Sequence, residues 1–575
     1  MYVLARRLAV SAMLIVVCGA RAQQVWHVDA DAATDGDGLS WASAFSGLQE
    51  ALALSSSGDE IWIAEGIYTP SDTDATLSFV MVDGVAIYGG FAGDETARSQ
   101  RNPATHLSIL SGDIGRDDTE NPFMINSSNA GHVIVASGVS SSTVIDGLTI
   151  EHGAYGPAGL IAGDPLFFGS GIYCIAGSPN INNCVFRFNY TAFAAGGAIY
   201  FRDAHPVITN STFSSNYGHL SNGGAIYLGG TSGAIIEDCA FTNSTLVFSS
   251  PDSSGGAIYH QSTSPLEVRR CLFENNIVRP FYSVGNDLGY GGAISSFSAP
   301  LLVEDSVFRG NKAPVGGAVI AWNESHIVNC LFENNTAEAR NGTIQELGGF
   351  GGGFCTYSFA DRTAYLENCT FVNNHGKEHG GVSGGWNSTA RLRNCILWHN
   401  TGWNPEFQGF YREQIGGGFD IAYCLIEDIF GPAGDGEDTL EPNRLVGCID
   451  SEPLFEAGSY RPSAGSPAID AGRNTDWTSM LTTDLDGNPR FVDDPDTTDT
   501  GSGSAPVIDM GAYEYQVASV CPADITGDGV LDFFDVSAFL NAYTAMNPAA
   551  DFDGNGVFDF FDVSAFLSAF SAGCP

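Results

Sequence analysis

Two acidic stretches near the C-terminal end of the chain have residue types and spacing suited to binding a cation. Residues 524–535 read DITGDGVLDFFD and residues 551–562 read DFDGNGVFDFFD, so the second nearly repeats the first. In both, oxygen-bearing side chains occupy positions 1, 3, 5, 9 and 12, with glycine at position 6: Asp524, Thr526, Asp528, Asp532 and Asp535 in the first, and Asp551, Asp553, Asn555, Asp559 and Asp562 in the second. The backbone carbonyl at position 7, from Val530 or Val557, would add another oxygen of the kind that Ca²⁺ prefers. The sequence therefore predicts two Ca²⁺ ions, one in each stretch.

An acidic turn that binds no metal is the alternative interpretation of each stretch. A single stretch would be weak evidence, but two in tandem with the full ligand spacing favour calcium. Each stretch continues into Val-Ser-Ala-Phe-Leu, from Val536 and from Val563, which predicts an amphipathic helix. Cys521 and Cys574 bracket both stretches, and we expect them to form a disulfide because small exported domains need such crosslinks.

Residues 518–575 resemble the GC-type dockerin family of anchoring modules, on these two loops and the helices that follow them. The resemblance implies a small α-helical domain with tandem EF-hand-like loops, and a cohesin-like or other surface anchoring protein as its partner. Dockerins that bind cohesins usually carry small polar residues at loop positions 10 and 11, but this chain has phenylalanine at all four places: Phe533, Phe534, Phe560 and Phe561. These four residues are the candidate partner-binding surface, and they argue against a standard cohesin as the partner.

Polysaccharide cleavage is the second chemistry to consider, because dockerins often accompany polysaccharide-degrading enzymes. The Gly-His-Gly and Arg-Ile-Lys strings of polygalacturonases and the Trp-Ile-Asp-His string of pectate lyases do not occur in the sequence. A glycosidase needs only two carboxylates, so a polysaccharide lyase or O-glycosyl hydrolase in polysaccharide catabolism stays open as the alternative function. The HGKEH string at His375–His379 is a candidate general-base patch, although a solvated loop is the favoured interpretation.

Aromatic residues gather after the last clear repeat. They could stack on sugar rings, but capping of the last coil is the favoured interpretation: Trp386, Trp398, Trp403, Phe407, Phe410 and Tyr411.

A two-part signature repeats through the middle of the chain. The first part is Gly-Gly-Ala-Ile or a close variant: Gly196–Ile199, Gly223–Ile226, Gly255–Ile258, Gly291–Ile294 and Gly316–Val319. The second is Phe-x-x-Asn: Phe186–Asn189, Phe213–Asn216, Phe273–Asn276, Phe308–Asn311, Phe332–Asn335 and Phe371–Asn374. A period of 24 to 39 residues with strand-like alternation between the signatures predicts stacked β coils. The fold class expected is mainly β, a right-handed parallel β-helix.

The signatures also predict what fills the coils. Glycine pairs suit turns with positive φ or close backbone approach, and asparagine suits left-handed turns and stacked amide ladders. Cysteine two residues before the phenylalanine should point inward with it, as a ladder of free thiols: Cys184, Cys239, Cys271, Cys330, Cys369, Cys395 and Cys424. Phe241 is followed by Ser244 where the pattern expects asparagine.

Three further segments resemble parts of exported bacterial proteins. The repeat over residues 169–400 resembles that of the polymorphic outer-membrane proteins, and Val25–Asp29 with Asp37–Trp41 resembles the opening of pectin-lyase-like β-helices. Phe45–Leu54 has helical spacing and should cap the first coil, whose strands are expected at Gly58–Ala64 and Val85–Phe91. Residues 450–517 resemble the choice-of-anchor Q region, because they contain GSPAIDAG at Gly465–Gly472 and DMGAYEY at Asp509–Tyr515.

Charge and the N-terminal residues indicate the compartment. Arg6 and Arg7, an apolar run and Ala20-Arg21-Ala22 predict a signal peptide over residues 1–22, and no later run is long and apolar enough to span a membrane. A net charge of −43 with two lysines argues against nucleic acid as a partner.

The expected organisation is a signal peptide, a cap with the first coils (23–110), β-helix repeats (111–449), the choice-of-anchor Q-like region (450–517) and the dockerin-like domain (518–575). The expected function is that of an exported protein, secreted or on the cell surface. It would bind a glycan or surface, or be structural, and be anchored through its calcium-binding module.

Overall fold

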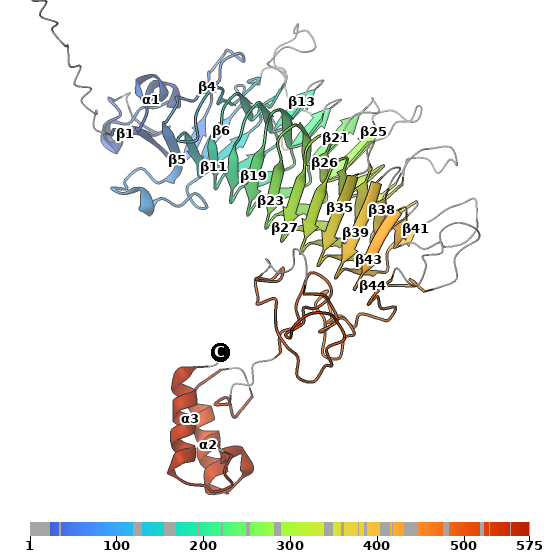
Figure 1. The fold of residues 1–575 in the computed structure, drawn as a ribbon. Helices are drawn as coiled ribbons and strands as arrows, with labels where there is room; N and C mark the ends of the chain where they lie inside the picture. Colours follow the sequence, from blue (N-terminus) through green and yellow to red (C-terminus); the bar gives the residue numbers. More distant parts are fainter. Residues whose placement is uncertain are drawn as a thin grey trace, which may run out of the picture. The chain divides into compact units, whose positions relative to one another are not determined.

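The chain is mainly β, and its strands build a parallel β-helix (Figure 1). The computed structural model describes residues 23–573 except 34–35, 119–128, 155–167, 193–194, 220–221, 249–253, 281–288, 339–348, 358–361, 378, 385–387, 403–413, 417, 431–444, 475–481, 518–521, 528–529 and 553. The α-helices of this described part are α1 (Leu48–Leu54), α2 (Phe533–Thr544) and α3 (Phe560–Ala572). The predicted fold class, mainly β with a parallel β-helix, is confirmed.

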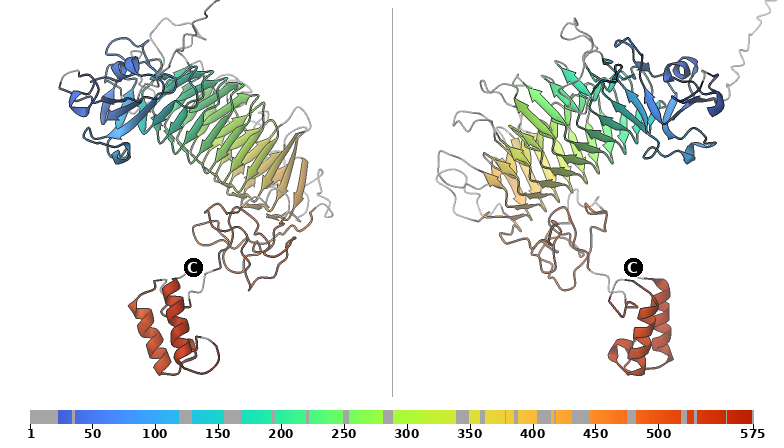
Figure 2. Two further views of the ribbon diagram at one scale, coloured as in Figure 1. Left: turned by 60° about the vertical axis from the view of Figure 1, so that its left-hand side comes forward. Right: turned by 180° about the vertical axis from the view of Figure 1, so that it is seen from behind.

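The chain divides into two compact units. The N-terminal unit comprises residues 1–302, 309–323 and 337–348, and the C-terminal unit comprises residues 303–308, 324–336 and 349–575. Strands in both units pair in parallel, as the two further views in Figure 2 show.

Strands of the N-terminal unit fall into four sheets. The first has β1 (Val25–Val28), β2 (Glu60–Ala64), β5 (Ala86–Phe91), β8 (Val144–Asp146), β11 (Asn180–Asn182), β15 (Val207–Thr209), β19 (Ala234–Glu237) and β23 (Leu266–Arg269). The second has β3 (Gly66–Tyr68), β6 (Ser108–Ser111), β9 (Leu148–Glu151), β12 (Val185–Arg187), β16 (Thr212–Ser214), β20 (Ala240–Thr242) and β24 (Leu272–Glu274). The third has β4 (Phe79–Val80), β7 (Ile134–Val135), β10 (Ile172–Ile175), β14 (Ile199–Arg202), β18 (Ile226–Gly230), β22 (Ile258–Ser262), β26 (Ile294–Ser296) and β30 (Val319–Ala321). The fourth has β13 (Tyr190–Ala192), β17 (Tyr217–His219), β21 (Thr245–Phe248), β25 (Ile277–Pro280) and β29 (Lys312–Ala313).

The C-terminal unit has four corresponding sets. The strands of the first set are β31 (Ser325–Val328), β35 (Arg362–Glu367), β39 (Ser388–Arg393) and β43 (Gly418–Ala422), and those of the second are β32 (Leu331–Glu333), β36 (Thr370–Val372), β40 (Ile396–Trp398) and β44 (Leu425–Ile426). The third set has β34 (Phe354–Thr356), β38 (Val382–Gly384) and β42 (Ile415–Gly416). The fourth has β37 (His375–Gly376) and β41 (Thr401–Gly402). The remaining strands are β27 (Leu301–Glu304), β28 (Val307–Arg309) and β33 (Thr336–Ala337).

The N-terminal cap differs in detail from the expectation. Helix α1 begins at Leu48, because Phe45 instead forms a parallel bridge with Val28. Leu48 and Leu52 of α1 are buried, which covers the open edge that the helix was expected to protect. The expected strands are present as β2 and β5, and β1, which pairs with β2, was missed because Val25–Val28 is too short to show alternation.

The two glycines of each Gly-Gly pair have different roles in the turn before a strand of the third sheet. The first glycine has positive φ, for example 73° at Gly223 and 78° at Gly255. A Cβ on the second glycine would meet the carbonyl of the matching glycine one coil later, at 2.0 Å for both Gly224 and Gly256. The first position therefore needs glycine for its conformation, and the second needs it for close approach of the coils.

Phenylalanine rings stack along the inside of the β-helix. In the N-terminal unit the centroids of Phe186, Phe213, Phe241 and Phe273 are 4.6 to 4.8 Å apart, and successive ring planes differ by 3 to 6°. This spacing equals the separation of neighbouring strands in a sheet, so one residue per coil in the same register is enough to form the stack.

Cysteine lies beside this stack as predicted. The ten cysteines of the described part form no disulfide, and nine of them are buried. The thiols of Cys239 and Cys271 donate to carbonyls of the preceding coil, Ile208 O and Ile236 O, at 3.7 and 3.6 Å. The interior column therefore consists of small thiols that are satisfied by the backbone, and it needs no disulfide.

Asparagine side chains form a buried amide ladder. Asn276 Nδ2 donates to Asn311 Oδ1 at 3.0 Å and to the carbonyl of Phe241 at 2.8 Å, and Asn189 Nδ2 donates to Asn216 Oδ1 at 3.1 Å. The ladder was expected, but the left-handed conformation was assigned to the wrong residue. It belongs to the residue just before the ladder asparagine, such as Asn275 with φ of 56°.

Ser244 interrupts this ladder. Its Oγ is buried and has no hydrogen-bond partner in the described part of the chain, although its N–H donates to Asn276 Oδ1 at 3.1 Å. Ser244→Asn should let the new amide donate to Asn276 and accept from Asn216, which would stabilise the protein by about 1 kcal/mol. Urea unfolding of the full chain measures this. Thr242→Asn, at a part-exposed position of the same coil, is the control and should change stability by less than about 0.5 kcal/mol. A Ser244→Asn protein no more stable than the control would contradict the ladder argument.

Candidate functional site

Each acidic stretch near the C-terminus turns directly into a helix through a reciprocal cap. Asp532 Oδ1 accepts from the N–H of Phe534 at 2.7 Å, and Asp535 Oδ2 accepts from the N–H of Asp532 at 3.0 Å. The second stretch repeats both bonds at Asp559 and Asp562, at 2.7 and 2.8 Å. The Asp-Phe-Phe-Asp sequence thus starts α2 and α3 by satisfying their first free amides. The two helices that the sequence predicts are present.

The same carboxylates also fold the loops back on themselves. The second oxygen of Asp535 accepts from the N–H of Thr526 at 3.0 Å, and that of Asp562 accepts from the N–H of Phe552 at 2.7 Å. Hydrogen bonds from the amides of Asp532 and Thr526 hold the pKa of Asp535 below its usual value. Both position-12 carboxylates are buried at the base of their loops.

The donor set fits a hard cation. Asp551 Oδ1 is buried and has no hydrogen-bond partner in the described residues, while Asp551 Oδ2 accepts from the N–H of Gly556 at 2.8 Å. An ion would satisfy that oxygen, and carboxylate oxygens are the ligands that Ca²⁺ prefers. Each loop would hold one ion. In the first loop the described ligands are Asp524, Thr526, Asp532 and Asp535, and in the second they are Asp551, Asn555, Asp559 and Asp562. Four predicted site residues lie outside the described residues: Asp528, Asp553, Cys521 and Cys574.

Phenylalanine pairs at the start of α2 and α3 are exposed to solvent. Phe533 and Phe534 are 77% and 67% exposed, and Phe560 and Phe561 are 75% and 66% exposed. The interior of the helical pair is formed instead by other aromatic residues, with Phe539 and Phe566 stacked at 4.0 Å between ring centroids. The four exposed rings therefore contribute little to this small core and are available for contact with a partner.

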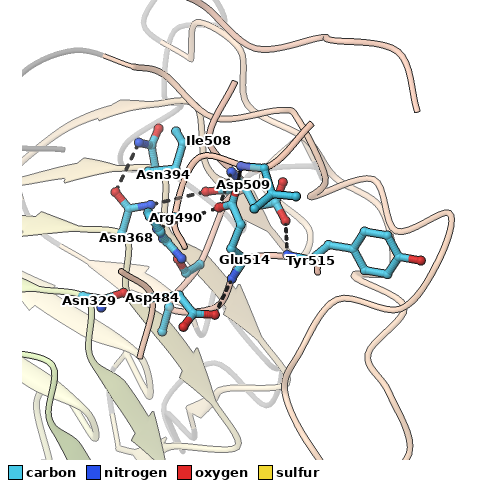
Figure 3. Close-up of polar contacts among 12 residues, drawn as sticks. Asn329, Asn368, Asn394, Asp484, Arg490, Ile508, Asp509, Glu514 and Tyr515 are labelled. Atoms are coloured by element: carbon cyan, nitrogen blue, oxygen red, sulfur yellow. Dashed lines mark hydrogen bonds and ion pairs between the residues drawn. The ribbon is translucent and has the colours of Figure 1, made fainter. Parts of the chain in front are cut away.

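The 450–517 segment packs against the edge of the coils in the C-terminal unit (Figure 3). Asn329, Asn368 and Asn394 occupy the same turn of successive coils, with φ between 50° and 56°. Their side chains bond to the segment as well as to each other: Asn368 Nδ2 donates to the carbonyl of Asp509 at 3.2 Å, and Asn394 Oδ1 accepts from the N–H of Arg473 at 2.8 Å. This asparagine row was not predicted as a contact site, because in the sequence it resembles ordinary turn residues.

A buried ionic cluster lies inside this segment. Arg490 and Glu514 have fully buried side chains, with Nε of Arg490 3.9 Å from Oε2 of Glu514, and Arg490 also donates to the carbonyl of Gly511. Glu514 accepts from the N–H groups of Val492 and Asp509 at 3.2 and 3.1 Å. Burial raises the pKa of Glu514 to about 9, with repulsion from Asp509 adding to it and Arg490 opposing it. Burial likewise raises the pKa of Asp470 to about 6.

Open surface cavities lie on the described part of each unit. One, of about 360 Å³ in the N-terminal unit, crosses β14, β18 and β22: Tyr200, Arg202, Tyr227, Gly230, Gln261, Ser262, Thr263 and Ser298 line it. The other, of about 780 Å³ in the C-terminal unit, has Arg393, Asp420 and Arg473 among its lining residues. Tyr200 and Tyr227 stack at 5.0 Å between ring centroids, so the smaller cavity has an aromatic side. Sequence reasoning missed both cavities, because their residues come from separate coils.

The other candidates from the sequence are only partly brought together. His375 is exposed in β37 and its Nδ1 is 2.8 Å from Thr401 Oγ1, whereas His379 is half-buried and the desolvation of its ring lowers its pKa to about 4. Of the aromatic group, Trp398 lies in β40, and the others lie outside the described residues.

Comparison with solved structures finds chains of low sequence identity. A solved pectate lyase, Pel9A, is 13% identical and has a TM-score of 0.38, and the match covers 87% of this chain and 98% of that one. A rhamnogalacturonan lyase is 12% identical with a TM-score of 0.26, covering 83% and 96%. The family 28 exopolygalacturonase of Yersinia enterocolitica is 11% identical with a TM-score of 0.24, covering 69% and 78%. The comparison with curated proteins finds no match. The family model of the right handed beta helix region matches residues 132–349, so the repeated coils of this chain are a right-handed parallel β-helix.

Proposed function

We propose that this chain is an exported protein, secreted or held at the cell surface, that is anchored through a calcium-dependent, dockerin-like C-terminal module and binds a polysaccharide on its β-helix. The single observation that carries the anchoring part is the repeated loop. Both loops place aspartates at positions 9 and 12 with the same hydrogen bonds, and both end beside an exposed phenylalanine pair. The second loop also leaves Asp551 Oδ1 without a hydrogen-bond partner in the described residues.

Anchoring by a protein partner explains the exposed rings. Two phenylalanine pairs at equivalent places on α2 and α3 form two apolar contacts, and contact residues of this kind dominate the free energy of many protein interfaces. No helix in the described part of the chain is long and apolar enough to cross a membrane. Attachment through a partner, which the dockerin resemblance implies, would therefore account for surface localisation of an exported chain.

Polysaccharide binding is supported by the smaller cavity. Tyrosine combines an apolar ring with a hydroxyl, and the same cavity adds the guanidinium of Arg202, the amide of Gln261 and the hydroxyl of Thr263, which match the many hydroxyls of a glycan. Binding is favoured over cleavage because no carboxylate is among the described residues that line this cavity, whereas glycoside hydrolysis uses two. A polysaccharide lyase or hydrolase is the alternative function.

Substitution in the cavity tests this function. Tyr227→Ala should weaken binding of the full chain to its glycan on an array by about tenfold, which corresponds to about 1.4 kcal/mol. Tyr190→Ala is the matched control, because Tyr190 belongs to a separate tyrosine stack with Tyr217, in the fourth sheet. Equal binding by wild type and Tyr227→Ala would contradict the proposed surface. Release of unsaturated or reducing sugar by the wild-type chain would favour the enzyme alternative.

A further inference from the structure

An acidic group outside the two C-terminal loops lies in the 450–517 segment. Asp470, Asp493 and Asp499 each contribute one carboxylate oxygen, and these oxygens lie within 4.8 Å of one another. Oxygens that coordinate one Ca²⁺ lie 2.3–2.6 Å from it, so any two of them are at most about 5 Å apart. The three carboxylates are thus close enough to share an ion.

A second observation, the hydrogen bonding of Asp470, also points to a bound ion. Its side chain is fully buried, and its Oδ1 has no hydrogen-bond partner in the described residues. Oδ2 accepts only one bond in this part of the chain, from the N–H of Asp494 at 3.2 Å. A buried carboxylate oxygen without a partner is costly, and two neighbouring acids increase the repulsion on it. A cation would remove both penalties.

A second cluster of three acids in the described residues shows the contrast. Asp113, Asp117 and Asp118 also gather within 4.8 Å. However, both oxygens of Asp113 already accept from backbone amides, those of Asp117 and Asp118 at 3.2 and 3.1 Å. The buried carboxylate of Asp113 therefore closes a turn, and its two oxygens have hydrogen-bond partners without an ion.

We propose that Asp470, Asp493 and Asp499 bind one Ca²⁺ ion and that this ion fixes the 493–501 loop to the part of the segment that contacts the coils. Asp470 is well placed for this role. Its carbonyl accepts from the N–H groups of Thr500 and Gly501, both at 3.0 Å, and its own N–H donates to Asp509 Oδ1 at 2.7 Å. The carbonyl of Asp509 in turn accepts from Asn368 on the coil edge. The ion therefore stabilises how the segment packs on the β-helix.

This site is separate from the C-terminal loops, and hydrogen–deuterium exchange of the full chain distinguishes them. Calcium should slow exchange of the Thr500 and Gly501 amides at least tenfold in wild type. Asp470→Asn should abolish that effect and reduce the bound calcium, measured by equilibrium dialysis, by one ion per chain. Asp496→Asn changes an exposed acid of the same loop outside the cluster, and it should behave as wild type.

Two outcomes would overturn the site. One is a wild-type chain in which calcium leaves the exchange of Thr500 and Gly501 unchanged. The other is an Asp470→Asn chain that keeps every ion. If Asp470→Asn does not fold, Asp499→Asn replaces it, because Asp499 is exposed and its loss should remove the same ion. Failure of the C-terminal loops to bind calcium would show instead at α2 and α3 and would leave the 493–501 loop responsive.

Discussion

Removing calcium from the full chain should unfold α2 and α3 while the β-helix stays folded. The sequence of each C-terminal loop has four carboxylates, and the helical pair has few fully buried side chains with which to offset their repulsion. Each ion adds about 4 kcal/mol when free calcium is about 1,000 times its dissociation constant. Two ions would therefore supply more free energy than so small a core can provide without them.

Hydrogen–deuterium exchange in chelator measures this directly. The amides of Phe533–Thr544 and Phe560–Ala572 should lose protection by several orders of magnitude, and those of the buried strands should not change. Asp535→Asn and Asp562→Asn should each remove one ion, and Asn541→Ala, an exposed position on α2, is the control that keeps both. Helices that stay equally protected with chelator, in a chain that takes up no calcium there, would end the dockerin interpretation.

Arg490→Met should detach much of the 450–517 segment from the coils. Methionine fills similar space but takes the buried guanidinium away from Glu514 and from the carbonyl of Gly511, and leaving a buried polar group without its hydrogen-bond partner costs about 1–3 kcal/mol. Limited proteolysis should then cut the segment at least tenfold faster. Cleavage within the strands of the N-terminal unit should keep its wild-type rate. An Arg490→Met segment as resistant as wild type would show that Arg490 does not hold this cluster together.

The pH dependence of the same segment follows from Glu514. Its pKa is raised to about 9, whereas an unfolded glutamate titrates near 4.3, so between these values the folded chain holds a proton that the unfolded chain has released. The stabilisation from Glu514 is therefore complete below about pH 4 and is lost as pH rises through 9. Glu514→Gln imitates the protonated form and should flatten this decline. A decline of equal size in wild type and Glu514→Gln would assign it to other groups.

Repeated local patterns explain why so much of the β-helix was predictable. Phe213, Phe241 and Phe273 each occupy the same position in successive coils. The sequence pattern of one coil therefore predicts which residue of the next coil joins the stack. The C-terminal helices were predictable for a different reason. Their start depends on Asp532 and Asp535, three residues apart, and such short-range bonds are visible in the sequence itself.

Contacts between distant residues explain what was missed. Asp470 meets Asp509 and Asp493 only after the segment has folded on itself, and no spacing in the sequence brings them together. His379 looked like part of a polar loop because its neighbours are charged, yet its ring lies against Gly416 on the next coil. The cavity beside Tyr227 likewise exists only because successive coils each contribute residues to it.

The stacked phenylalanine and asparagine columns have a consequence for how such a gene can change. Each coil presents the same side chains, in the same register, to the coil before it and the coil after it. Loss of one whole period, from Phe241 up to Phe273, would bring Phe213 against Phe273 and would also remove the faulty step at Ser244. Unequal recombination between repeats can therefore lengthen or shorten this protein by whole coils while the packing of the interior side chains stays the same.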